Sequence, residues 1–166
     1  MDINKAIDLF LEEIRSFRSE YEDMTKGLTS ANKESAQKEF QDKFLKKHNI
    51  TTEKRGTLSV PYYIKQYSGT IKLTVRDVSK QFTNNKVILF NHKKEVRRID
   101  TLYKYNNKNI CIDIWTSDIT KADQLKVGSA IELTGDFEIS YYKYDGDETV
   151  NISYKGSKPD FTIVSI

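Results

Sequence analysis

Apolar side chains recur at helical spacing in the first third of the chain. From Ile3 to Met24 they lie alternately four and three residues apart, which predicts an amphipathic helix with one apolar seam. Gly27 is a typical C-terminal stop, and Thr29 or Ser30 can cap a second helix over about residues 30–48. This part of the chain is therefore predicted to form a helical hairpin.

The apolar seam of the first helix has two interpretations. It can pack against the second helix or the rest of the chain, or it can bind a protein partner or a second copy of the chain. The heptad-like pattern lasts barely three repeats, which is short for a coiled coil. We expect the seam to be internal, with self-association or partner binding through these helices as the alternative.

Beyond residue 50 the apolar period becomes an alternation. Ile71, Leu73 and Val75 alternate with polar residues, which predicts a strand with one apolar face. Turns are expected at Asn106–Asn109 and at Asp145–Gly146, each between two further strands. The remaining predicted strands cover 95–105, 110–114, 130–144, 149–154 and 161–166, and a short helical link covers 118–125.

This order of elements indicates the fold class. Strands that follow one another without long helices argue against a parallel α/β fold. One strand, a hairpin, a helical link, a second hairpin and a last strand suit a five-stranded OB-fold barrel. We therefore expect a mainly β protein with an α-helical N-terminal extension (α+β), in which residues 1–54 form the extension and residues 55–166 form a closed barrel.

Composition narrows the class of protein. No run of eighteen apolar residues exists, and Asp2, Glu12 and Glu13 interrupt any signal-like segment, so we expect an intracellular protein (cytoplasm, nucleoid or nucleus) without membrane contact. A lone cysteine, Cys111, and two histidines argue against a disulfide or a zinc site. Phosphate loops, nucleophile elbows and close histidine pairs are missing, so we expect no enzyme, catalytic residue, metal or cofactor.

The net charge of +3 is mild but unevenly distributed. Residues 1–54 hold 10 Lys/Arg against 11 Asp/Glu, whereas residues 55–166 hold 17 against 13. Lysine and arginine side chains placed along a groove can neutralise the phosphates of a nucleic acid. The alternative interpretation is that these charges belong to a strand face that is simply exposed to solvent. The densest basic patch comprises Lys86, Lys93, Lys94, Arg97, Arg98 and Lys104.

Trp115 is the leading aromatic candidate. In residues 110–115 the three isoleucines share one face of a strand, and Cys111, Asp113 and Trp115 share the other. If the isoleucines fill the barrel, Trp115 points outward and offers a platform for a nucleobase, an interaction worth roughly 1–3 kcal/mol per base. The alternative is a tryptophan covered by the helical extension.

A second aromatic group surrounds Lys143. Rings interleaved with a cation suit stacked bases and their phosphates. Because side chains alternate along a strand, all four rings cannot be ligands, and we favour Tyr142 and Tyr144 together with one further ring. The four candidates are Phe137, Tyr141, Tyr142 and Tyr144.

Three segments resemble a known family. Residues 111–115 (Cys-Ile-Asp-Ile-Trp), 125–128 (Leu-Lys-Val-Gly) and 131–135 (Ile-Glu-Leu-Thr-Gly) resemble the OB domain of archaeal replication protein A and related single-stranded DNA-binding proteins. The resemblance extends over roughly residues 70–155. It implies stacking of DNA on three positions, Trp115, Phe137 and either Tyr141 or Tyr142.

The expected function is sequence-tolerant binding of single-stranded DNA in replication or repair. The aromatic rings would stack on bases, and the phosphates would contact Lys93, Lys94, Arg97, Arg98, Lys104 and Lys143. Two alternatives stay open. One is an OB-fold protein-interaction subunit of a heteromeric replication or telomere complex, and the other is binding of single-stranded RNA.

Overall fold

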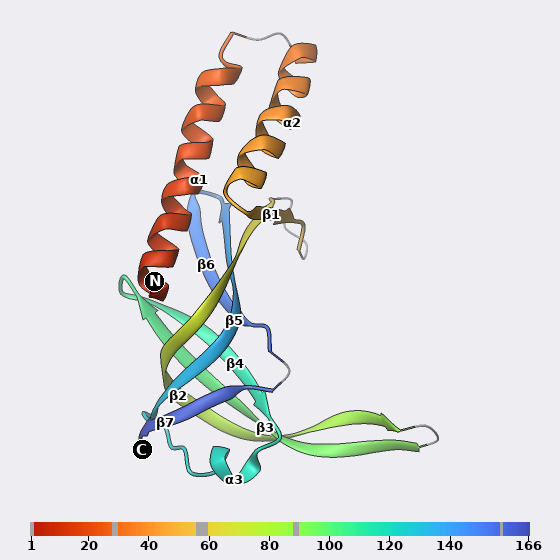
Figure 1. Ribbon diagram of the computed structural model, residues 1–166, viewed down its shortest axis with the longest axis vertical. Coiled ribbons are helices and arrows are strands. Elements are labelled where there is room, and N and C mark those ends of the chain that lie inside the picture. Colours follow the sequence, from red (N-terminus) through yellow and green to blue (C-terminus); the bar gives the residue numbers. More distant parts are fainter. Residues whose placement is uncertain (1, 28–29, 56–59, 88–89, 157) are drawn as a thin grey trace. The chain divides into compact units, whose positions relative to one another are not determined.

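Two helices begin the chain in the computed structural model, which describes residues 2–27, 30–55, 60–87, 90–156 and 158–166 (Figure 1). The helix α1 spans Ile3–Thr25 and α2 spans Ser30–Lys47, so the predicted helical hairpin is confirmed. Gly27, at φ +82°, ends α1, whereas the proposed cap Thr29 lies outside the described residues. No helix in the described ranges is long and apolar enough to cross a membrane.

The seam of α1 is buried, as expected, from Ile3 to Phe17. Phe17 stacks on Phe40 of α2 with ring centroids 5.6 Å apart, and it packs against Phe44 at 5.1 Å. Such aromatic pairs contribute about 0.5–1.5 kcal/mol beyond the area that they bury. The aromatic part of the seam therefore joins the two helices.

Strands make up most of the rest of the chain. They form one sheet in the order β4-β3-β2-β5-β6, with β1 paired to β2 and β7 paired to β5. The mainly β fold with an N-terminal helical extension is confirmed. The strands are β1 (Ile50–Glu53), β2 (Tyr62–Val87), β3 (Phe90–Tyr105), β4 (Lys108–Thr116), β5 (Ala130–Tyr144), β6 (Asp147–Tyr154) and β7 (Asp160–Ser165), and the short helix α3 (Ile119–Ala122) precedes β5.

The closed five-stranded barrel is not confirmed. Among the described residues the sheet is open, and no pairing joins its end strands β4 and β6. The strand β2 is also much longer than its clear alternation at residues 71–75, because the residues on either side of that segment pair with β1 and β3. Its register shifts between Val75 and Asp77, at a β-bulge of the kind that bends a strand.

The described chain forms two compact units. The first unit contains Ile3–Gln66 and Ile139–Val150, and the second contains Tyr67–Glu138 and Asn151–Ile166. The predicted helical extension lies in the first unit, together with β1 and parts of β2, β5 and β6. Most of the strand residues in which we predicted a barrel belong to the second unit.

Alternation decides which side chains of the second unit are buried. Ile110, Ile112 and Ile114 of β4 are at most 4% exposed, whereas the intervening residues face solvent. On β3, Ile99 lies opposite Ile114 and is fully buried. The predicted apolar face of residues 110–115 is therefore confirmed, and it forms part of the core.

A two-residue turn sets the register of β3 and β4. Asn106 and Asn107 have φ values of 45° and 64°, and Tyr105 pairs with Lys108 on either side of them. Two successive positive φ angles are typical of the type I′ turn, whose twist matches that of a hairpin. The predicted turn at 106–109 is thus correct in place but shorter, because Lys108 already belongs to β4.

Substitution of Asn107 tests this turn. Asn107→Ala should lower the free energy of unfolding by about 1 kcal/mol, because alanine is disfavoured at positive φ. Asn107→Gly, the matched control, should equal or exceed the wild type. Urea unfolding measures both, and an alanine variant as stable as the wild type would contradict the role given to the turn.

Candidate nucleic-acid interface

Residues that alternate with the buried isoleucines form one exposed surface of β3 and β4, which we call the outer face. Trp115 is 46% exposed and lies directly opposite Arg98. Cross-strand neighbours share a face of the sheet. The prediction that Trp115 points outward is confirmed. The outer face comprises Arg98, Asp100, Leu102 and Lys104 of β3 and Asn109, Cys111, Asp113 and Trp115 of β4.

Carboxylates hold the arginines of this region in place. Arg98 Nη2 donates to Asp113 Oδ2 at 2.9 Å, and Arg76 on β2 donates to Asp100 through Nε at 3.0 Å and Nη2 at 2.6 Å. These hydrogen bonds raise the pKa of both guanidinium groups. Because a guanidinium carries five N–H donors, Arg98 keeps further N–H groups beside Trp115 after it donates to Asp113.

Basic side chains continue along the distal hairpin of β2 and β3, residues 78–87 and 90–99, which we call the arm (Figure 1). Lys93 and Lys94 are exposed there, and no ion pair to a described residue involves them. Lys104 is exposed too, at the end of the outer face away from Trp115. The side chain of Lys86 lies outside the described part of the chain.

Arg97 differs from the other predicted phosphate contacts. Its Nε and Nη2 donate to the two oxygens of Asp123, at 2.8 and 3.3 Å, and its Nη1 donates to Glu95 Oε1 at 3.2 Å. Asp123 is the C-cap residue of α3, and the Arg97 side chain is only 13% exposed. Arg97 therefore anchors the base of the arm instead of offering a free cation to a phosphate.

Two of the predicted stacking rings lie in the core. Phe137 is 0% exposed and packs against Tyr154 at a centroid distance of 5.5 Å. Tyr141 is 1% exposed, and burial raises the pKa of its hydroxyl to about 12. Neither ring presents a face to a base, so the stacking implied for Phe137 and Tyr141 does not carry over. Alternation placed both on one face of β5, and both faces are buried there, since Glu138 and Ser140 are buried too.

The other aromatic candidates belong to the first unit, whereas Trp115 and the arm belong to the second. Tyr142 stacks on Tyr62 of β2, with centroids 4.5 Å apart and an interplanar angle of 22°. Tyr144 is 50% exposed and Lys143 is exposed. Alternation along β5 places Lys143 on the opposite face of the strand from Tyr142 and Tyr144.

Sequence reasoning missed Phe82, which lies on the arm. Its ring is 57% exposed, and Lys80 Nζ lies 5.5 Å from its centroid. The register places Phe82 opposite Glu95, and the next cross-strand pair on the same face is Asn84 with Lys93. The only signal in the sequence is a single phenylalanine within a polar run, between Lys80 and Lys86.

No group of three or more His, Cys, Asp or Glu side chains in the described ranges is placed to hold a metal ion. Comparison of the chain with known protein families, with characterised proteins and with solved structures finds no match. The features that point to a function are therefore the exposed ring of Trp115, Arg98 held by Asp113, and the basic arm.

Acid unfolding tests the network at the base of the arm. Hydrogen bonds from Lys80 and Arg97 lower the pKa of Glu95 below 4.5. Glu95 therefore contributes stability that is present above pH 4.5 and is lost as the pH falls through its lower folded pKa. Glu95→Gln should flatten the dependence of unfolding free energy on pH below 4.5, measured by urea unfolding. Glu132→Gln, at an exposed site of β5, is the control and should leave this pH dependence unchanged. The same pH dependence in the wild type and both variants would contradict the role of Glu95.

Proposed function

We propose that the chain binds single-stranded DNA on the outer face and arm of the second unit. The observation that carries the proposal is an exposed tryptophan on β4 beside Arg98 of β3, which Asp113 orients, because β3 continues into the basic arm. Stacking on Trp115 would supply affinity for any base, because every base has a π-face. Lys93, Lys94, Lys104 and Arg98 would contact phosphates, and protection of exposed strands in replication or repair is the role we propose.

The sheet order supports an OB-type arrangement. With β2 counted as the first barrel strand, the order β4-β3-β2-β5-β6 places the second and third strands side by side, and α3 lies between the third and fourth. An OB-fold is a partly open five-stranded barrel that binds oligonucleotides on the face of strands 2 and 3 and on the loop between strands 1 and 2. By this count the outer face corresponds to the face of strands 2 and 3, and the arm corresponds to the connection between strands 1 and 2.

Loss of the stacking ring should weaken binding of an oligo-dT. Trp115→Ala should raise the dissociation constant about 5- to 150-fold, which corresponds to roughly 1–3 kcal/mol of lost stacking. Anisotropy of a labelled oligonucleotide measures this loss, and quenching of Trp115 fluorescence gives an independent signal in the wild type. Val127→Ala, at a residue 78% exposed, is the matched control.

An unchanged dissociation constant in Trp115→Ala, or no binding by the wild type at micromolar concentration, would contradict the proposal. The second result would favour the protein-interaction subunit. An oligo-rU of the same length, titrated in parallel, tests RNA as the target, since the same equipment binds both.

The arm lysines should determine the salt dependence. Each phosphate contact to single-stranded DNA contributes about 0.7 to the slope of log affinity against log salt. The double variant Lys93→Gln/Lys94→Gln should therefore lower the slope by about 1.4 and weaken binding equally for different base compositions. Lys38→Gln, exposed on α2 of the first unit, is the control, and a slope that the double variant leaves unchanged would exclude the arm.

A further inference from the structure

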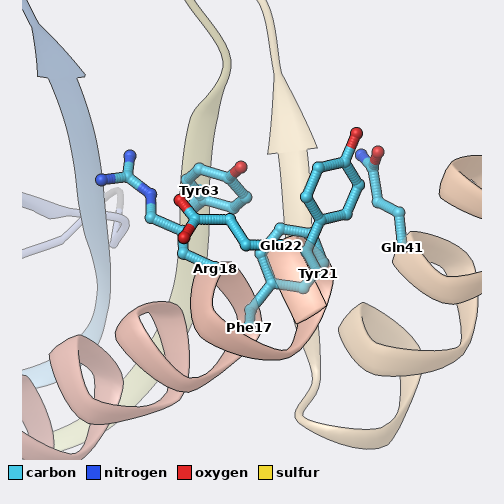
Figure 2. A pocket seen from close by; sticks show the side chains of 6 residues that line it. All are labelled: Phe17, Arg18, Tyr21, Glu22, Gln41 and Tyr63. Carbon is cyan, nitrogen blue, oxygen red and sulfur yellow. The ribbon is translucent and has the colours of Figure 1, made fainter. Parts of the chain in front are cut away.

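The first unit contains a cleft of about 370 Å³ that plays no part in the proposed DNA interface. Six side chains from α1, α2 and β2 line it, and Figure 2 shows them. Its volume is within the range of small-molecule sites, which combine aromatic surface with a few convergent polar groups. The lining residues are Phe17, Arg18, Tyr21, Glu22, Gln41 and Tyr63.

Aromatic rings form the apolar part of the cleft. The ring of Phe17 is buried, and it lies 5.9 Å from Tyr21 and 6.1 Å from Tyr63. Phe40 and Phe44 pack against Phe17 and hold it in place. In the view of Figure 2, Glu22 and Phe17 lie between Tyr63 and Tyr21, with Arg18 and Gln41 at the two sides. The planes of Tyr21 and Tyr63 are inclined to Phe17 by 36° and 59°, and a flat ligand can stack on either tyrosine ring.

Most hydrogen-bonding groups of the cleft side chains have no partner among the described residues, although Arg18 contacts an aromatic ring. In the described part of the chain, none of Arg18, Tyr21, Glu22, Gln41 and Tyr63 makes a side-chain hydrogen bond or ion pair. Arg18 and Glu22 are one helical turn apart, yet the guanidinium of Arg18 lies 5.5 Å from the Tyr141 ring centroid. Burial raises the pKa of Tyr63, so its hydroxyl stays a neutral donor. The cleft therefore offers one carboxylate acceptor together with several donors.

We propose that this cleft binds a guanine base. The two neighbouring N–H groups of guanine, at N1 and N2, match a single carboxylate, and Glu22 is the only carboxylate among the six lining residues. Guanine O6 and N7 accept hydrogen bonds, which the phenol hydroxyls, Gln41 and Arg18 can donate. Adenine and cytosine present no such pair of adjacent ring and amino donors. A cationic peptide side chain would suit the rings, but the positive charge of Arg18 opposes it.

Calorimetric titration of the full chain with GMP, AMP, CMP and N-acetylarginine amide tests the assignment. GMP should bind more tightly than AMP or CMP, and Glu22→Gln should weaken GMP binding about tenfold or more, because a bidentate base contact is lost. Tyr63→Phe should weaken it by a smaller factor. Glu20→Gln, exposed on the same helix, should bind GMP as the wild type does, and thermal unfolding verifies that each variant is folded.

The source of the base is tested with oligonucleotides. Tighter binding of dT strands containing one dG than of oligo-dT, removed by Glu22→Gln, would identify guanine within a strand as the ligand. GMP binding without that preference would identify a free nucleotide. Equal affinity for GMP and AMP, no binding at millimolar GMP, tight binding of the arginine derivative alone, or an unchanged Glu22→Gln variant would each overturn the proposal.

The guanine site and the DNA interface use different residues, so their failures are distinguishable. Trp115→Ala should leave GMP affinity unchanged, and Glu22→Gln should leave oligo-dT affinity unchanged. A loss of GMP binding in Trp115→Ala would overturn the assignment to the cleft of the first unit.

Discussion

The cross-strand register of β3 and β4 is the constraint on which the candidate interface depends. It places Ile99 against Ile114 in the core and Arg98 beside Trp115 on the outer face. A slip of one residue would turn every side chain of β4 to the opposite face, burying the tryptophan and exposing the isoleucines. The core and the proposed stacking platform are therefore two consequences of one pairing, which the turn at Asn106–Asn107 begins.

The arginines of the second unit are positioned by ion pairs with carboxylates, in addition to the excess of basic residues in this part of the chain. Arg98 is oriented by Asp113, and Arg97 is bound by Asp123 and Glu95. Exposed ion pairs contribute only about 0–1 kcal/mol to stability. Their main effect is therefore on the direction in which the arginine side chains point. These ion pairs orient two guanidinium groups, whereas Lys93 and Lys94 are exposed on the arm, where we propose that they contact phosphates.

Local patterns predicted the helical hairpin, the turns and the outward Trp115, because periodicity and turn chemistry act over a few residues. The open sheet and the length of β2 depend on pairing between distant segments, which no local pattern contains. Alternation placed Phe137 and Tyr141 on one face of β5 but could not show that both are buried, because which side chains of β5 are internal depends on neighbouring elements. The exposed position of Phe82 on the arm depends on the pairing of β2 with β3, and the cleft beside Glu22 forms where α1, α2 and β2 meet. Both require contacts between separate segments, so sequence reasoning missed them.

The most direct test of the account is the indole N–H signal of Trp115 in a nitrogen–proton correlation spectrum, titrated with oligo-dT. Trp115 is the only tryptophan, so this resonance needs no further assignment. The account predicts that the signal shifts progressively to saturation, because a base stacks on the ring, and that the shift is lost at high salt. An indole signal that stays in place while the oligonucleotide is bound would show that the outer face is not the interface.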